Sequence, residues 1–148
     1  MDDLAKIGFI SKRWIAEQLN QPPNFYDEGV TIPILDKGKL IACAAFTDFL
    51  PGEFGNSVEF HMAVLPEYQG KWRSNELLGS IFGYPFIELK CTRLWAQTTK
   101  INKKARRFCV SLNFKREGIS RNGWDGKHKA VIYSLLPEEC EYLEYYKK

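Results

Sequence analysis

The segment 58–78 constrains the fold of this chain more than any other. The apolar stretch Val58–Val64 predicts a strand, and the leucines after Ser74 fall at helical spacing, so a short polar loop joins a strand to a helix. The loop 69–74, QGKWRS, brings backbone N–H groups, the positive end of a helix dipole and two cationic side chains together. We therefore predict a pyrophosphate site. The loop has one glycine and matches neither the dinucleotide nor the P-loop pattern.

Two blocks of sequence carry a resemblance to a known family. Residues 63–71, AVLPEYQGK, resemble the acetyl-CoA loop of the GNAT N-acetyltransferase superfamily. Residues 94–118 are similar to that family's next strand, to its helix that starts at an asparagine, and to the turn that follows. This second block resembles the subgroup that acetylates the N-termini of ribosomal proteins. The two blocks and the segment between them cover about residues 57–135.

Three glycine-like positions of the family pattern carry other residues in this chain. Trp72 and Ser74 stand where the loop of the family has glycine-like residues. A glycine lets the backbone approach a pyrophosphate closely, whereas an indole has to swing aside or stack on the ligand. Asn113 replaces a glycine before a phenylalanine, a mild change because Asn tolerates the left-handed conformation that ends a helix.

The resemblance implies that acetyl-CoA is the cosubstrate. In the family's fold, the strand that matches 59–64 splays from the strand that matches 94–98, and the pantetheine arm lies in the gap. The residues implied to hold the cofactor lie on the first strand, in the loop and at the start of the later helix. They are Met62, Ala63, Val64, Gln69, Gly70, Lys71, Trp72, Arg73, Ser74 and Asn102.

The chemistry needs a base, because an ammonium must lose a proton before it can attack a thioester. Glu59 and His61 are the candidates: they lie two residues apart on a strand, so they point to the same face. Both fall on the element that carries the base in many relatives. The alternative is an exposed sheet face with a hydrogen-bonded histidine. The position of the family's usual acid corresponds to Cys109, for which a buried, small hydrophobic side chain is the alternative role, so the acid stays unassigned.

Hydrophobic periodicity predicts an alternation of helices and strands. The predicted helices are 11–19, with Ser11 as N-cap, 73–89, broken or bent at Pro85, and 102–112. The predicted strands are 30–35, 40–46, 59–64, 93–98, 115–121 and 127–135. The turn at 36–38 predicts a hairpin between the first two strands, and Pro33 predicts that the first one is an edge or carries a bulge.

This order predicts an α+β (mixed α/β) fold with a central, mostly antiparallel, twisted sheet flanked by helices. A length of 148 residues and a hydrophobic content of 45% suffice for one packed core. The chain shows no linker and no repeat. We therefore expect a single acetyltransferase-like domain over residues 1–148.

Composition excludes several classes of function. The net charge of +3 is consistent with an anionic ligand but too weak by itself to argue for nucleic acid. Four widely spaced cysteines, no signal peptide and no membrane-spanning run predict reduced thiols in a cytoplasmic protein. His61 and His128 lack the spacing of metal ligands, so no metal site is expected.

We expect an acetyl-CoA-dependent N-acetyltransferase that acts by direct attack of a primary amine, on a protein N-terminus, a lysine or a small molecule. One alternative is a noncatalytic binding or assembly protein with a decayed cofactor site, in which Trp72 fills the pyrophosphate space and the aromatic tail docks on a partner. Another is a toxin-like acetyltransferase of aminoacyl-tRNA, with cations at 103–107 and 115–121 on phosphates. The acceptor amine and the choice between monomer and homodimer stay open.

Overall fold

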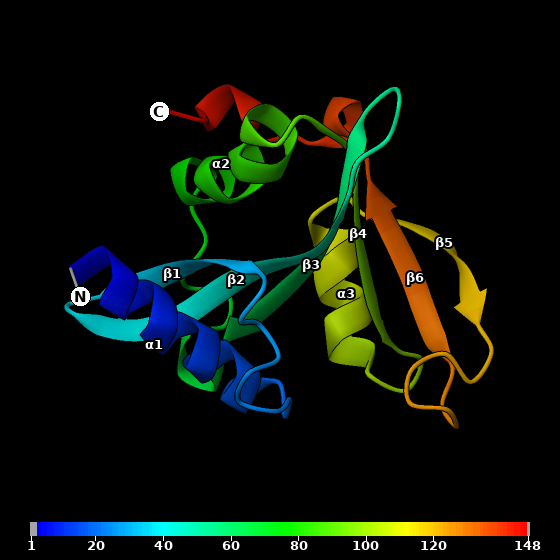
Figure 1. Cartoon of the computed structure of the whole chain (residues 1–148), viewed down its shortest axis with the longest axis horizontal. Helices are drawn as coiled ribbons and strands as arrows, with labels where there is room; N and C mark the ends of the chain where they lie inside the picture. The colour runs from blue at the N-terminus through cyan, green and yellow to red at the C-terminus, as the bar shows by residue number, and fades with distance from the viewer. Residues whose placement is uncertain (1–2, 148) are drawn as a thin grey trace.

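The computed structural model of the chain describes the backbone of residues 3–147 and the side chains of residues 6–147. It contains one six-stranded sheet and three α-helices (Figure 1). In chain order, the elements are α1 (Asp3–Gln18), β1 (Val30–Asp36), β2 (Lys39–Leu50), β3 (Asn56–Val64), α2 (Asn75–Gly83), β4 (Cys91–Thr99), α3 (Lys103–Ser111), β5 (Lys115–Ser120) and β6 (Ala130–Leu135).

The strand order in the sheet is β1-β2-β3-β4-β6-β5, and all neighbours are antiparallel except β3 and β4. The predicted α+β fold with a mostly antiparallel sheet is therefore confirmed. The predicted hairpin of β1 and β2 turns at Lys37 and Gly38, whose φ angles of 51° and 79° match the favoured two-residue hairpin turn. Pro33 lies in the edge strand β1, where its missing N–H removes no bond to a second neighbour.

Strands β3 and β4 are hydrogen-bonded only where each strand begins. Their parallel pairing runs from Asn56 opposite Cys91 to Glu59 opposite Trp95. Strand β3 continues to Val64 and β4 to Thr99, so the second halves of both strands lie beyond the pairing. The splayed gap that the family resemblance implies is therefore present, and it opens toward the carboxyl ends of both strands.

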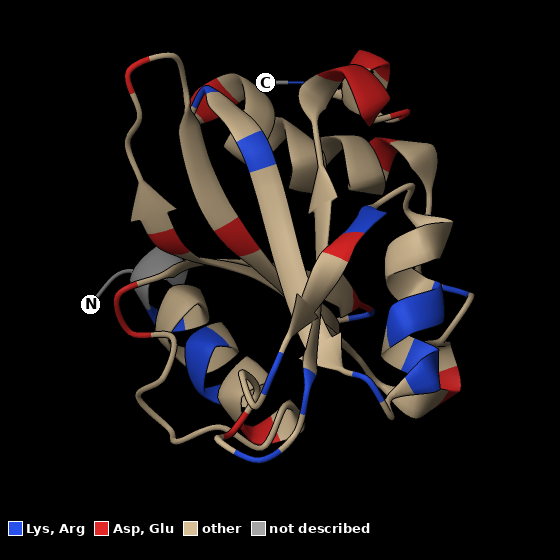
Figure 2. Ribbon diagram, turned by 90° about the vertical axis from the view of Figure 1, so that its right-hand side faces the viewer, with Lys and Arg blue, Asp and Glu red and all other residues tan. Residues whose placement is uncertain are grey.

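Helices cover both faces of the sheet. Figure 2 shows α1 and α3 on opposite sides of it. Because side chains alternate along a strand, β2 contributes side chains to two separate hydrophobic clusters. Phe46 belongs to the larger cluster with α2 and α3, whereas Cys43 and Ala45 belong to the cluster with Ile15 of α1. The two faces of β3 alternate in the same way. Even-numbered residues such as Phe60 face α2 and α3, and Ala63 faces α1.

The first helix is longer than predicted. It begins at Asp3, so Ser11 is an interior residue and the predicted N-cap is wrong. The fully buried hydroxyl of Ser11 donates to the Gly8 carbonyl at 3.0 Å and lies 2.7 Å from the Thr31 hydroxyl of β1. A serine favours both caps and such back-bonded interior positions, and local sequence does not distinguish them.

The second helix begins and ends close to the prediction. The Ser74 hydroxyl is the N-cap and accepts the Leu77 N–H at 3.1 Å. The α-helix stops at Gly83, and a five-residue π-turn, Tyr84–Glu88, follows. Pro85 lies in this turn, where its missing N–H breaks the α-helical ladder, so the break predicted there is confirmed.

Asparagines delimit the third helix. Asn102 is its N-cap, and the Asn102 side-chain oxygen accepts the Ala105 N–H at 3.1 Å. Asn113 follows the helix with a φ of 72°, which confirms the left-handed conformation expected of it. The prediction for β6 was three residues too long, because the chain from Lys127 to Lys129 belongs to the hairpin loop and the strand starts at Ala130.

Strand β2 also differs from the prediction. It extends to Leu50 rather than ending at Phe46. Its register with β3 shifts between Thr47 and Leu50, and Asp48 within this bulge has a φ of 55°. A bulge redirects side chains at the end of a strand, so the carboxyl group of Asp48 is placed by an irregularity that alternation does not predict.

The C-terminal segment packs on α2 of the same chain. Tyr142 stacks on Phe82, with ring centroids 5.9 Å apart and an interplanar angle of 17°. A Cβ atom added to Gly79 would lie 2.8 Å from the Tyr145 backbone carbon, and one added to Gly83 would lie 2.2 Å from the Tyr146 ring. The two glycines therefore let the tail approach the helix closely, and the tail tyrosines have an intramolecular partner.

We predict that Gly79→Ala destabilises the protein by about 1–3 kcal/mol, because its methyl group overlaps the Tyr145 backbone. Gly8→Ala in α1 is the matched control: its Cβ meets nothing within 4 Å among the described residues, and it should stabilise by up to about 1 kcal/mol through helix propensity. Urea unfolding of both variants measures the difference. Equal effects of the two substitutions would contradict the close packing of the tail.

Candidate active site

Glu59 lies at the apex of the gap between β3 and β4. It is the last residue of β3 that is paired with β4, and it is 5% exposed. Gln97, two residues beyond the paired part of β4, donates from its side-chain nitrogen to Glu59 Oε2 at 3.3 Å. The carboxyl group of Glu59 therefore lies at the point where the strands separate, and Gln97 of β4 hydrogen-bonds to it across the gap.

Burial raises the pKa of Glu59 to about 7. The hydrogen bond from Gln97 opposes this rise in pKa, and the nearby carboxyl group of Asp48 adds to it. A carboxyl group with a pKa near 7 exchanges its proton at physiological pH. It is therefore suited to general-base chemistry in a way that an ordinary, exposed glutamate is not.

His61 is placed beside Glu59 as the strand alternation predicts, with Nε2 3.7 Å from Glu59 Oε2. Its ring nitrogens contact the Thr47 hydroxyl at 2.7 Å and the Tyr26 hydroxyl at 3.4 Å. Burial lowers the pKa of His61 to about 4, so the ring is neutral at pH 7 and its contact with Glu59 is not an ion pair. The histidine acts there as a neutral hydrogen-bonding group.

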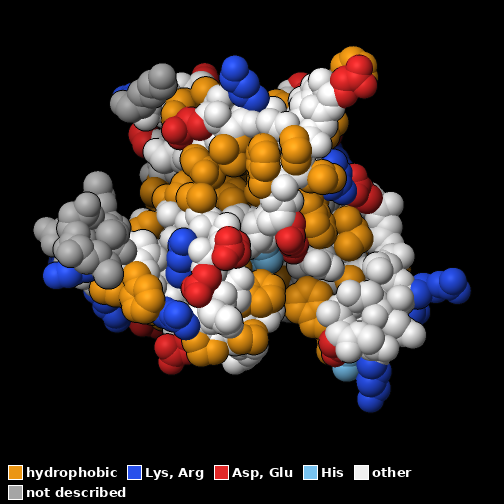
Figure 3. Space-filling model, in the orientation of Figure 1, with side chains coloured by type: hydrophobic (Ala, Val, Ile, Leu, Met, Phe, Trp, Pro, Cys, Tyr) orange, Lys and Arg blue, Asp and Glu red, His pale blue; other side chains and the backbone are white. Residues whose placement is uncertain are grey.

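The polar groups adjoin apolar surface. The Phe25 ring is 45% exposed, and its centroid lies 6.3 Å from that of His61. Phe49 and Leu50, which follow Asp48 in β2, are 50% and 66% exposed. Figure 3 shows hydrophobic side chains gathered in a band across one face of the molecule, below α2. An acceptor that reaches these groups would therefore have apolar side chains to pack against.

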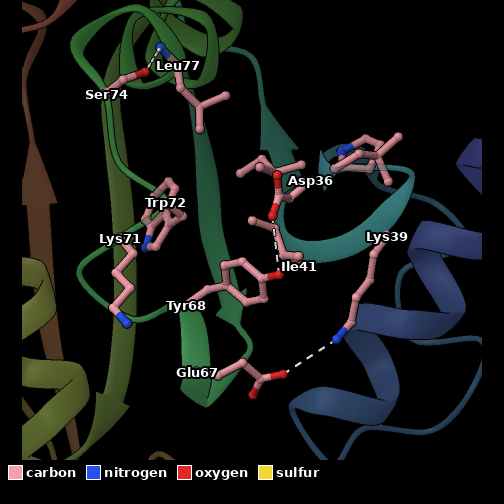
Figure 4. Close-up of a pocket in the computed structure, with 12 residues that line it drawn as sticks. Asp36, Lys39, Ile41, Glu67, Tyr68, Lys71, Trp72, Ser74 and Leu77 are labelled. Atoms are coloured by element: carbon pink, nitrogen blue, oxygen red, sulfur yellow. Dashed lines mark hydrogen bonds and ion pairs between the residues drawn. The ribbon is translucent and has the colours of Figure 1, made fainter.

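The loop between β3 and α2 places Lys71 and Trp72 at the same cavity, with Lys71 exposed and Trp72 buried. Trp72 is 8% exposed, and it lines a cavity of about 760 Å³ between the loop and β1–β2. In Figure 4 the Tyr68 hydroxyl points across this cavity to Asp36, at 3.2 Å, and Lys39 reaches toward Glu67, at 3.6 Å. The cavity has an apolar floor that includes Ile34 and Ile41.

Two contacts join this loop to α3. The Trp72 ring lies 6.3 Å from the Phe108 ring, centroid to centroid. The Arg73 guanidinium donates to the Ser111 hydroxyl at 3.0 Å and to the Ser111 carbonyl at 3.5 Å. A ligand that enters between the loop and α3 would have to separate Trp72 from Phe108.

The other residues assigned to the cofactor lie around the gap. Met62 and Val64 pack on the larger core, and Ala63 packs toward α1. Gly70 has a φ of 79°, and Gln69 follows the short turn at Pro66–Tyr68. Asn102 is exposed, and its side-chain oxygen caps α3. All of these residues flank the gap or begin the helices beside it.

Cys109 faces inward from α3 and is 9% exposed. Burial raises the pKa of its thiol to about 11, so the group keeps its proton at pH 7. The other three cysteines are also free thiols.

Sequence analysis missed two members of the site, Thr47 and Gln97. Thr47 is a polar residue in a largely apolar strand, whereas Gln97 lies in a strand that mixes polar and apolar residues. Gln97 follows Trp95 at a spacing of two, so alternation placed the two side chains on one face. Only the pairing register of β3 and β4 brings that face to Glu59.

A sheet that splits beside a strand–loop–helix connection, with a buried carboxyl group at the apex, fits the fold of an acetyltransferase. The family model described as Acetyltransferase (GNAT) family matches residues 5–114. The chain therefore belongs to the GNAT acetyltransferase family. No curated protein sequence matches the chain.

Solved structures show the same fold. A probable acetyltransferase is 25% identical, over 75% of this chain and 63% of its own, with a TM-score of 0.61. Ribosomal-protein-S5-alanine acetyltransferase from Vibrio fischeri is 16% identical, over 78% and 64% of the two chains, with a TM-score of 0.63. A chimera of spermidine N-acetyltransferase SpeG from Vibrio cholerae and hSSAT is 20% identical, over 96% and 93%, with a TM-score of 0.65. This chain spans less than two thirds of the length of the first two.

Two further findings concern only the part of the chain that the structure describes. It contains no group of three or more His, Cys, Asp or Glu side chains arranged to hold a metal ion. None of its helices is both long enough and apolar enough to cross a membrane.

The raised pKa of Glu59 predicts a pH-dependent stability. The folded state binds the proton more tightly than the unfolded chain, so stability falls as pH rises from about 4.5 to about 7. Glu59→Gln removes this effect. We expect the variant to gain about 3 kcal/mol relative to the parent between about pH 4 and about pH 8, measured by urea unfolding.

The control for this experiment is Glu67→Gln, which removes an exposed carboxylate paired with Lys39. Its effect should stay within about 1 kcal/mol at both pH values. A pH-independent difference between the parent and Glu59→Gln would show that Glu59 ionises normally.

Proposed function

We propose that this chain is an acetyl-CoA-dependent N-acetyltransferase whose residues 1–148 form one domain and which acetylates a primary amine by direct attack. The observation that carries the proposal is the position of Glu59: a buried carboxyl group with a pKa near 7, at the apex of the gap between β3 and β4. Family membership supports acetyl transfer, and the site supplies the base that this transfer needs.

The residues around the gap fit acetyl-CoA. The second half of β3, Phe60–Val64, lies beyond the pairing with β4, so its edge offers backbone N–H and C=O groups to the amides of a pantetheine arm. The loop 69–74 leads into the N-terminus of α2, where N–H groups and the helix dipole favour a pyrophosphate. Lys71 and Arg73 add positive charge near the N-terminus of α2.

In this mechanism the ionised form of Glu59 accepts the proton of the acceptor ammonium, directly or through one water molecule. The neutral amine attacks the carbonyl carbon of the thioester, and the carbon–sulfur bond breaks. His61, which is neutral at pH 7, stays a hydrogen-bond partner between Thr47 and Tyr26. Asp48, exposed at the bulge beside Glu59, attracts the cationic acceptor before its deprotonation.

The leaving thiolate needs a proton. Cys109 is the residue of this chain at the family's acid position, and its raised pKa keeps it protonated at pH 7. A donor with a pKa of about 11 transfers its proton less readily than one near 7. Cys109 is therefore a candidate acid, and we expect solvent to serve equally.

The second candidate function is a noncatalytic binding protein, and one observation favours it. Trp72 and Phe108 meet where the loop faces α3, beside the loop that the family resemblance assigns to the pyrophosphate. The cavity of about 760 Å³ on the other side of Trp72 leaves room for the ring to move away. The two functions therefore differ in whether the Trp72 ring moves away when acetyl-CoA binds.

We predict that Trp72→Gly binds acetyl-CoA about two- to tenfold more tightly than the parent. Opening the parent site breaks the Trp72–Phe108 contact, which is worth about 0.5–1.5 kcal/mol beyond area burial. Calorimetric titration measures both affinities. Trp124→Gly, an aromatic-to-glycine change in the β5–β6 hairpin loop, should leave the affinity unchanged.

Weaker binding by Trp72→Gly would show that the indole stacks on the cofactor instead of obstructing it. If neither protein binds acetyl-CoA at millimolar concentration, the catalytic proposal fails and the binding protein is the better description.

We predict that Glu59→Gln lowers kcat for acetyl transfer by about 10²–10⁴, the usual contribution of a general base. In the parent, kcat/KM should rise with pH and level off above about pH 7, because the ionised form of Glu59 is the active one. The variant should lose this limb of the profile. Glu67→Gln should keep both the rate and the profile, and a profile unchanged in Glu59→Gln would remove Glu59 from the role of base.

A further inference from the structure

Positive and negative residues are distributed unevenly along this chain, although its net charge is small. Residues 100–129 contain ten of the 21 Lys and Arg residues and only two of the 18 Asp and Glu residues, so this segment has a formal charge of +8 and the rest of the chain −5. Figure 2 shows Lys and Arg residues on α3 and around the neighbouring ends of β4, β5 and β6. The whole-chain value of +3 conceals this local concentration of charge.

The two acidic residues of the segment do not neutralise these cations. Glu117 pairs with Arg93, which lies outside the segment, and Asp125 pairs with His128, at 2.7 Å. Among the side chains that the structure describes, none of the ten Lys and Arg residues forms an ion pair within 4.0 Å. The segment therefore presents cations whose charge is balanced only by solvent ions.

Part of this charge lines a groove of about 470 Å³ beside α3. Lys103, Arg106 and Arg107 line it together with Val110 and the Tyr133 side chain of β6. The Nε atom of Arg106 is buried and has no hydrogen-bond partner among the described residues. A buried N–H without an acceptor is unfavourable, and an anionic oxygen in this groove would satisfy it.

The groove adjoins the candidate cofactor site at the C-terminal end of α3. Arg106 and Val110, one helical turn apart, line the groove beside Tyr133, whereas Phe108 contacts Trp72 of the loop. Ser111, which also lines the groove, accepts a hydrogen bond from Arg73 of the loop, so the two sites adjoin there. The cations that line the groove, Lys103, Arg106 and Arg107, are nevertheless different residues from Lys71 and Arg73.

We propose that this surface binds a single-stranded nucleic acid through its phosphates, with the groove at α3 as one phosphate position. Ten cations spread over α3, the preceding turn, β5 and the hairpin loop exceed what one phosphate needs, and they suit a polyanion. Trp124 in the hairpin loop is 41% exposed, and an exposed aromatic ring stacks on an unpaired base. The partner is a strand with unpaired bases, which RNA and DNA both provide.

The test is fluorescence anisotropy of a labelled strand of about twelve nucleotides, as RNA and as DNA, titrated with the full chain at about 50 mM and about 200 mM salt. We expect the logarithm of the binding constant to fall linearly with the logarithm of the salt concentration, with a slope of about −0.7 for each phosphate contacted. The double variant Arg106→Gln, Arg107→Gln should reduce that slope by about 1.4 and weaken binding at least tenfold at the lower salt. Comparison of the affinities for the RNA and the DNA oligonucleotide shows whether the surface prefers one of them.

The matched control is Lys37→Gln, Lys90→Gln, which removes the same charge far from α3 in the sequence and should leave the affinity within about twofold. Because Arg106 is partly buried, Arg107→Gln alone is a second variant with less risk to folding. Equal losses in the control and the groove variant would overturn the proposal, as would no binding at the lower salt.

Two further outcomes would also overturn it. Displacement of the strand by saturating acetyl-CoA would assign these cations to the cofactor's phosphates. Equally tight binding of a polyglutamate peptide would point to an acidic protein partner. Because the assay needs no acetyl transfer, its result is independent of the proposed enzymatic activity.

Discussion

Strands β3 and β4 share hydrogen bonds only over their first residues, and the candidate site depends on this limit. Past Glu59 and Trp95 the strands separate, which leaves the edge of β3 without a strand partner. Buried or partly buried backbone groups need partners, so such an edge suits a ligand that carries amides of its own. The separation also fixes where the loop before α2 and the helix α3 stand, because each follows one of the two diverging strands.

Burial then determines the chemistry of the groups at the apex. Glu59 and His61 lie on one face of β3, yet the low-polarity surroundings move their pKa values in opposite directions, since burial disfavours the charged form of each. The acid becomes a group that titrates near pH 7, and the histidine becomes neutral. One physical effect therefore assigns different roles to two residues that sequence analysis treated as equivalent candidates.

Helix α3 borders two surfaces with different character, which meet at Ser111. Its side toward the loop carries Phe108, which packs on Trp72, and its other side carries Arg106 and Val110 beside Tyr133. The first surface is apolar and closed by contact, whereas the second is a groove lined with cations. A helix can serve both because residues three or four positions apart share a side and those two apart do not. The charge pattern of residues 100–129 thus lies on α3, on the turn before it and on the β5–β6 hairpin, and Tyr133 of β6 shares the groove with α3.

Local sequence determined the order of elements, the break at Pro85, the turn at Gly38 and the left-handed Asn113, because each depends on the backbone preference of one residue or on periodicity. The family resemblance rests on the residues of two blocks, 63–71 and 94–118. Tertiary structure decided the rest. The interior position of Ser11, the bulge at Asp48, the approach of Gln97 to Glu59 and the contact of Trp72 with Phe108 all join residues from separate elements. Their geometry is set by strand register and core packing, which are cooperative properties of the whole chain and leave no local signal in the sequence.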